Sequence, residues 1–310
     1  MPQLTRKRLL LAKTEVAYGT DIVPDGTNAI LVRNLDITPL QSDIVQRELI
    51  RPYLGNYEQL LAQTRVQVTF EVELAGSGTV GTEPKYGVVL EACGLSKVIS
   101  GGISVTYAPE SANFDSVTLY FFQDGTRHAV TGARGSFTLN AAVGAIPTIA
   151  FEMTGIYTAP TTPAAVVPTY ANQATPLIFK NGNTTSFTAF GYAAALQSID
   201  LNISNEIIYR ELVGGTKEVL ITDRKPSGTL QIESPSLSLK DYFTTSTSNT
   251  LGSITFQHGT ATGNRVTLTM AQADLANASY TDMDGMTMLN LPYVATPTAA
   301  GNDELSLVFT

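Results

Sequence analysis

Apolar and polar residues alternate over many short stretches of this chain, which is the pattern of β-strands with one face in water. Residues 66–74 (VQVTFEVEL) show the pattern most clearly, because apolar residues occupy every second position. The turn sequences Asp124-Gly125 and Asp284-Gly285 separate several of these stretches. The chain is therefore predicted to be mainly β, with further strands at 103–107, 117–122, 136–140, 149–157, 196–203, 229–233, 265–270 and 304–309.

Helical periodicity is sparse and predicts two short helices. The better candidate is 84–95 (PKYGVVLEACGL), where Pro84 suits the first helical position and Gly94 suits the end. The second candidate is 238–245. Cys93 falls on the apolar face of the first helix, so it is predicted to be a small buried hydrophobic residue rather than a reactive thiolate.

The second half of the chain resembles the first. Residues 35–49 (LDITPLQSDIVQREL) align with 199–212 (IDLNISNEIIYREL) after one gap, and both stretches end in Arg-Glu-Leu. The likeness continues, because 66–73 (VQVTFEVE) aligns with 227–234 (SGTLQIES) and a helix candidate follows each. This shared order predicts an internal duplication.

A stretch rich in proline, threonine and alanine separates the two halves and is typical of an extended linker. We therefore predict a first domain at residues 1–158, which includes an N-terminal arm, a linker at 159–176, and a second, repeat-related domain at 177–310. A length of 310 residues is sufficient for two domains of ordinary size.

Composition narrows the possible partners. The 19 basic and 27 acidic side chains give a net charge of −8, which argues against a surface dedicated to binding nucleic acid. The basic cluster at residues 6–8 is followed by only four apolar residues, which is short for a secretory signal, and no apolar run approaches the length of a membrane span. We expect a protein that does not insert into membranes.

One glycine motif resembles a cofactor site. Gly76, Gly78 and Gly81 form a literal G-x-G-x-x-G between a predicted strand and a predicted helix. The strand before a dinucleotide-binding loop is buried on both faces, whereas residues 66–74 place polar side chains at alternate positions. The motif is therefore interpreted as a flexible glycine loop, and no cofactor is expected.

No catalytic or metal-ligating residues are predicted. His128 and His258 both lie near turn glycines, without other ligands at metal-binding spacing, and are predicted to be surface-loop residues. No nucleophile motif accompanies them. The sequence Asp282-Met283-Asp284-Gly285 resembles the start of a calcium loop, but its glycine comes too early, so a hairpin turn is predicted instead. An enzymatic function is not expected.

The repeated Arg-Glu pairs are the remaining candidates for a functional role. Arg47 and Glu48 in the first repeat correspond to Arg210 and Glu211 in the second. They fit two interpretations, namely the solvated end of a strand or an ion pair between subunits that each chain makes twice. The sequence leaves both interpretations open.

Five stretches together resemble the tail tube, or major tail, proteins of bacteriophages with long, non-contractile tails. Each is of moderate specificity, and their shared order carries the resemblance. In order along the chain they are 11–34 (LAKTEVAYGTDIVPDGTNAILVRN), 47–55 (RELIRPYLG), 68–74 (VTFEVEL), 83–95 (EPKYGVVLEACGL) and 301–309 (GNDELSLVF).

The resemblance implies two tandem β-sandwich or barrel-like domains, each with a short flanking helix. Hairpins of neighbouring subunits would form a continuous cylindrical sheet, and rings would stack into a tube for genome ejection. A duplicated chain would need three copies for a pseudo-hexameric ring. The resemblance also implies location in the virion tail, assembly in the bacterial cytoplasm, and tape measure, terminator and distal tail proteins as partners.

DNA would pass through the tube without specific binding, and an acidic lumen would repel its phosphates. Two alternative functions are a capsid or tail decoration protein and a carbohydrate-binding β protein. The second is disfavoured by the absence of tryptophan and of a recognisable secretory signal.

Overall fold

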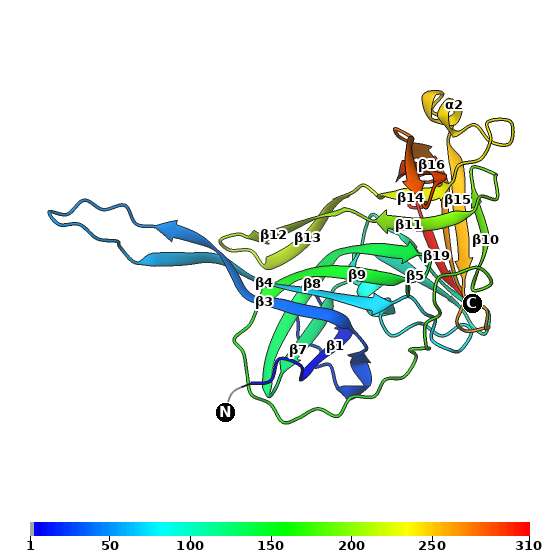
Figure 1. Cartoon of the computed structure of the whole chain (residues 1–310). Coiled ribbons are helices and arrows are strands. Elements are labelled where there is room, and N and C mark those ends of the chain that lie inside the picture. The colour runs from blue at the N-terminus through cyan, green and yellow to red at the C-terminus, as the bar shows by residue number, and fades with distance from the viewer. Residues whose placement is uncertain (1–2) are drawn as a thin grey trace.

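The computed structural model describes residues 3–310 and confirms a mainly β fold (Figure 1). The first two residues of the predicted N-terminal arm lie outside the described residues. The helices are η1 (Gly26–Asn28), α1 (Gly87–Ala92) and α2 (Tyr242–Thr247). The strands are β1 (Arg8–Thr14), β2 (Ala29–Ile30), β3 (Arg33–Gln46), β4 (Gln59–Glu73), β5 (Leu95–Ser100), β6 (Ser104–Pro109), β7 (Val117–Gln123), β8 (Thr126–Ala142), β9 (Thr148–Tyr157), β10 (Thr184–Ala189), β11 (Leu196–Asn202), β12 (Asn205–Glu211), β13 (Lys217–Arg224), β14 (Ser227–Glu233), β15 (Gly252–His258), β16 (Val266–Leu275), β17 (Ser279–Met283), β18 (Met286–Ala295) and β19 (Ser306–Phe309).

Each predicted strand overlaps an observed one, and the two predicted turns join β7 to β8 and β17 to β18. Both helices are shorter than predicted. Helix α2 also begins later, because the Asp241 carboxylate caps it by accepting a hydrogen bond of 2.9 Å from the backbone N–H of Thr244. Cys93 is fully buried just after α1, as predicted, and burial raises the pKa of its thiol.

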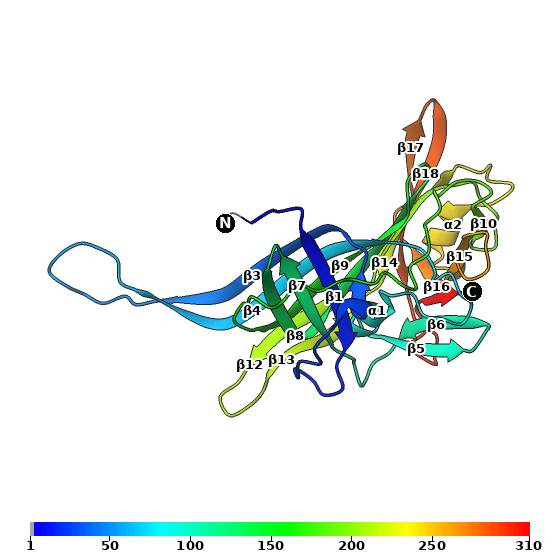
Figure 2. The same ribbon diagram turned by 90° about the horizontal axis from the view of Figure 1, so that it is seen from below.

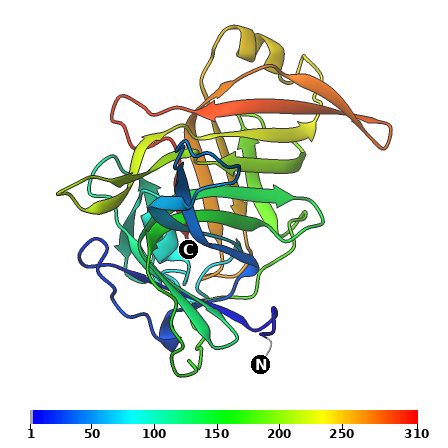
Figure 3. The ribbon, with the colours of Figure 1, turned by 90° about the vertical axis from the view of Figure 1, so that its left-hand side faces the viewer.

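Eight strands form one continuous antiparallel sheet, which we call the central sheet. Their order is β3-β4-β9-β8-β11-β14-β18-β17. The first four strands come from the first half of the chain and the last four from the second. In Figure 3 the strands of this sheet lie one below the other, from β18 (red-orange) through β14 (yellow) to β8 (green). The pairing of β8 with β11 joins the halves.

The two halves pair their strands in the same order. In the first half the neighbours run β1-β7-β8-β9-β4-β3, and in the second they run β10-β15-β16-β18-β14-β11. All of these pairs are antiparallel, and α1 and α2 each follow the strand in fifth place. In the second half, β16 and β17 together pair with β18, as the single long strand β8 pairs with β9.

The strand pairing changes the alignment of the halves by one residue. Asp36 lies opposite Thr69, and Asp200, its aligned counterpart, lies opposite Thr229, because Ile199 pairs with Leu230. Phe70 therefore corresponds to Leu230. Both side chains are buried on the inner face of the central sheet. The alignment of 66–73 with 227–234 would place one of them on the wet face, because neighbouring strand residues point to opposite sides.

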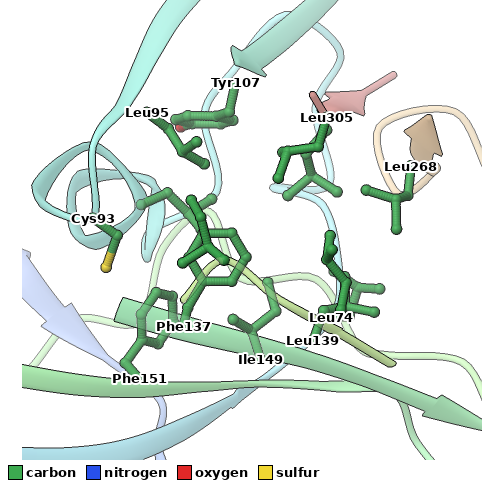
Figure 4. Close-up of a cluster of buried hydrophobic side chains, with 14 of the residues drawn as sticks. Leu74, Cys93, Leu95, Tyr107, Phe137, Leu139, Ile149, Phe151, Leu268 and Leu305 are labelled. Atoms are coloured by element: carbon green, nitrogen blue, oxygen red, sulfur yellow. The ribbon is translucent and has the colours of Figure 1, made fainter. Parts of the chain in front are cut away.

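One hydrophobic core extends through both halves. Phe151 stacks on Phe70 with ring centroids 5.3 Å apart, and Phe137 lies 6.1 Å from Phe151. Figure 4 shows Leu268 and Leu305 of the second half beside the first-half residues of this cluster. The C-terminal strand β19 also pairs with β6 of the first half and β16 of the second, so the halves share a core and a strand network.

Residues 159–176, predicted as a linker, run along the first half (Figure 1). Thr161 forms an isolated bridge with Arg127, and the Thr169 N–H donates a 2.8 Å hydrogen bond to the Gly26 carbonyl. The Ala174 N–H donates to the Gly76 carbonyl at 3.1 Å. The segment is therefore held by backbone hydrogen bonds at several points along its length.

The glycine loop after β4 packs closely against the second half. A Cβ on Gly76 would lie 2.2 Å from the carbonyl oxygen of Gly263, and the Gly78 N–H donates to that same oxygen at 2.9 Å. The Gly76 N–H donates to the side chain of Asn264 at 2.7 Å. These glycines permit a close approach of two backbones, so the interpretation as a flexible loop is wrong.

The prediction of surface-loop histidines is also wrong. His258 lies in β15 and is 2% exposed, while His128 is half-buried in β8. Both residues are strand residues next to a turn, and burial lowers the pKa of each.

Candidate assembly surface

Two hairpins extend from the central sheet (Figures 1 and 2). The long hairpin consists of β3 and β4, with its tip at residues 47–58. The short hairpin consists of β12 and β13, which continue β11 and β14 beyond the sheet and pair with each other. The two hairpins therefore occupy corresponding positions in the two halves.

The long hairpin exposes many apolar side chains. Ile50 and Leu54 at its tip are fully exposed, and Tyr53 is 66% exposed. Clustered apolar exposure of this kind is typical of an interaction surface. The short hairpin has a smaller set at Ile208, Leu212 and Val213. The full set on the long hairpin is Leu40, Ile44, Val45, Leu49, Ile50, Tyr53, Leu54, Leu60 and Leu61.

The Arg-Glu repeats lie at or next to the tips of these hairpins. Arg47 forms an ion pair with Glu58 across the long hairpin, and Glu48 is exposed beside it. Arg210 pairs with Glu218 at 2.9 Å across the short hairpin. The structure thus places both arginines equivalently, and each pairs within its own hairpin.

Glu211 completes the short hairpin's set by pairing with Lys217 at 3.0 Å. The ion-paired side chains on both hairpins are partly exposed. Exposed pairs contribute only about 0–1 kcal/mol each to stability. Their main structural effect is to connect the two strands near each tip.

An arginine not singled out by the sequence organises the long hairpin's tip. The Arg51 guanidinium lies over the rings of Tyr53 and Tyr57, at 4.7 and 4.2 Å from their centroids. It also donates a 2.9 Å hydrogen bond to the carbonyl of Asn56. These contacts fold the tip back on itself. An arginine followed by tyrosines two and six residues later is the signal that could have indicated it.

The central sheet ends in two edge strands. Within the described residues, β3 pairs in this sheet with β4 alone, and β17 pairs with β18 alone. Tyr280 in β17 is 60% exposed, although an aromatic residue in a sheet is usually covered. Edge strands present unpaired backbone groups that can bind another strand.

The open face of the central sheet is acidic. Arg33 is paired with Glu71 at 3.0 Å, and Arg65 is paired with Asp43 at 3.4 Å. Burial raises the pKa of Asp200, against a hydrogen bond from the Thr229 N–H. The carboxylates that alternate onto this face, which we call the acidic face, are Asp36, Glu71, Glu73, Glu152, Asp200 and Glu233.

The described part of the chain contains no group of three side chains placed to hold a metal ion. None of its helices is long and apolar enough to cross a membrane.

A family model for phage tail tube proteins matches residues 5–307, nearly the whole chain. The chain belongs to the phage tail tube protein family. None of the curated proteins compared with it matches. As a tail tube protein it is a structural component of the virion tail, and the mainly β fold predicted for it is confirmed.

Proposed function

We propose that this tail tube protein assembles into rings that stack into the tube through which the phage genome leaves the virion. Support comes from the central sheet, which begins at one open edge, β3, and ends at another, β17. A ring of chains leaves no edge unpaired, because the last strand of one chain meets the first strand of the next. This end-to-end arrangement is the observation that carries the proposal.

The ring contains three chains. Each chain contributes two sets of four strands with the same pairing order, so three chains supply six similar sets and 24 strands. Closed symmetric rings are the usual solution for repeated interfaces of this head-to-tail kind. The two tandem units, at residues 1–158 and 177–310, are proposed to be products of duplication.

The acidic face lines the lumen. The opposite face of the central sheet packs on the hydrophobic core, so only the acidic face is available to surround a channel. Both arginines on it are already paired with carboxylates. Basic surfaces hold DNA because binding to them releases counterions from the phosphates, and a negatively charged face does not cause this release. The genome therefore slides past the acidic face.

The two hairpins contact neighbouring subunits, and Arg47, Glu48, Arg210 and Glu211 act there. Their equivalent positions at two exposed, apolar tips support this role. The tube is assembled in the bacterial cytoplasm, with tape measure, terminator and distal tail proteins as partners. Family membership supports this placement.

Negative-stain electron microscopy of the purified protein tests the proposal. We expect stacked rings or tubes of uniform width. Uniformly small, separate particles would contradict it and favour a decoration protein.

A further inference from the structure

We propose that the ring closes by antiparallel pairing of β17 of one chain with β3 of the next, with Tyr280 opposite Ile37 and Thr281 opposite Asp36. This inference rests on the ring proposed above. It is more specific, because it assigns the strands and the register of the joint between chains.

The template is the joint within the chain, where β8 pairs with β11. Leu139 lies opposite Leu201, and Asn140 lies opposite Asp200. Leu139 and Leu201 are buried on the inner face. Hydrogen bonds from Val143 to Gln197 and from Ile203 to Phe137 continue this ladder at its two ends. The ladder joins the fourth strand of the first half to the first strand of the second.

Strand β17 corresponds to this part of β8. Leu139 lies opposite Ile149 in β9, and Tyr280 lies opposite Leu289 in β18. Ile149 and Leu289 are themselves equivalent, because they lie opposite the equivalent residues Val72 in β4 and Ile232 in β14. Tyr280 therefore takes the place of Leu139.

The turns that follow these strands agree with this correspondence. The same offset places Gly285 where Gly144 lies, and both are turn glycines with positive φ, 81° and 87°.

Strand β3 corresponds to β11. The sequence Leu35-Asp36-Ile37 aligns with Ile199-Asp200-Leu201 without a gap. A register shift precedes each, between Arg33 and Asp36 and between Leu196 and Ser198.

The opposite strands agree as well. Asp36 lies opposite Thr69, and the backbone N–H of Thr229 donates to the Asp200 carboxylate at 3.1 Å. Each aspartate therefore faces a threonine, and this shared pairing is the basis of the one-residue correction described above.

The exposed side chains on the edge strands β17 and β3 indicate that each of these edges lacks a neighbouring strand. Leu139 is 1% exposed in the internal joint, whereas its counterpart Tyr280 is 60% exposed and contacts Phe243 from one side. Ile37 is only partly buried, whereas its counterpart Leu201 is fully buried. Pairing of β17 with β3 covers Tyr280 and Ile37 together.

Two features limit the ladder. Pro39 follows Ile37 on the same edge and has no N–H, so the pairing ends there. Asp282 takes the inward position of Ala141, but it lies at the end of β17 beside the turn, where its carboxylate accepts from the Gly285 N–H at 3.4 Å. The Leu35 carbonyl already accepts from the Arg8 guanidinium, and its second lone pair is available to the incoming strand.

Disulfide trapping tests the register. In the internal joint Leu139 and Leu201 belong to the hydrogen-bonded set, so Asn140 and Asp200 form a non-hydrogen-bonded pair. By equivalence Asp36 and Thr281 form such a pair, with Cα atoms about 4.5 Å apart, which is within disulfide range.

The variant combines Asp36→Cys and Thr281→Cys with Cys93→Ser, and it is assembled under reducing conditions and then oxidised. We expect covalent dimers and trimers on a non-reducing gel. The matched control Thr38→Cys with Thr281→Cys should cross-link about tenfold less, because diagonal neighbours lie roughly 7–8 Å apart. A second registered pair, Thr38→Cys with Ser279→Cys, serves if the change at Asp36 prevents assembly.

The outcomes separate the two proposals. Tubes in which both registered pairs stay unlinked, or in which the control links preferentially, overturn the register and leave the tube function standing. Wild-type protein that forms no rings overturns the ring itself and this joint with it.

Discussion

His258 is held in one tautomer by its two neighbours. The Leu177 carbonyl, 3.1 Å from Nε2, can only accept, so Nε2 carries the proton. Nδ1 therefore accepts from the Thr184 hydroxyl at 2.9 Å. The ring also stacks on Phe179, with centroids 5.6 Å apart. A neutral imidazole satisfies this site fully, which agrees with the pKa lowered by burial.

This arrangement predicts a stability loss in mild acid. The pKa of His258 in the folded chain lies below its ordinary value of 6.5, so the unfolded chain binds the proton more readily. The stabilisation is complete above pH 6.5 and is lost as the pH falls below it. Between pH 7.5 and 5.0 the free energy of unfolding should fall more for the wild type than for His258→Gln, measured by denaturant titration. His128 titrates in both proteins and cancels in the comparison. Equal losses would contradict the assignment.

The position of His258 could have been predicted from the sequence. Ile254, Phe256 and His258 occupy alternate positions, and all three are buried on one side of β15. The adjacent Gly259 made a loop seem more probable than a continued strand. The burial of Cys93 was predicted correctly because its position follows the apolar face of the first predicted helix. The turn residue Gly94 comes only after it.

At the scale of elements, many strands with one buried face were predicted, but β15 and β18, which also bury one face, were missed, and so were the outer hairpin strands. β4 alternates clearly where it crosses the core. Most of β3 and β12 is exposed or only partly buried. These strands therefore do not need one apolar face, and their sequences lose the alternation of apolar and polar residues. The Arg-Glu-Leu repeat still marked both hairpins, although their pairing partners could not be read from it.

The hairpin charges give a prediction at this scale. Arg47→Ala and Arg210→Ala should each lower the free energy of unfolding of the single chain by less than about 1 kcal/mol, because both ion pairs are exposed. Tube yield in negative stain should nevertheless fall if these arginines act between subunits. Lys225→Ala is the matched control, since it removes another exposed ion pair from the base of the short hairpin. Unchanged yield in both arginine variants would show that the pairs only connect the hairpin strands.

At the scale of the whole molecule, the duplication leads to a prediction of mass. Native mass spectrometry of isolated rings should give three chains, because each chain supplies two of the six strand sets. A ring of six chains would contradict the pairing of the two halves as equivalent units.

The order of many elements could be predicted from the sequence, but not how the halves join. Pairing of β19 with both β6 and β16 links strands separated by most of the chain, and no local pattern encodes it. The single core through Phe137, Leu268 and Leu305 likewise depends on contacts across the predicted boundary. Composition and motifs indicated two units, whereas the fold packs them as one body.

The joint between β8 and β11 changes how a ring begins. Six separate units would need five encounters in solution before the sixth joint could close the ring, and every encounter costs translational and rotational freedom. Here folding of the chain forms every second joint, at the high effective concentration of a tethered segment. Only two encounters in solution then remain, and the third joint between chains closes the ring. A duplicated chain therefore lowers the kinetic order of ring formation and makes incomplete rings with the wrong number of units less accessible.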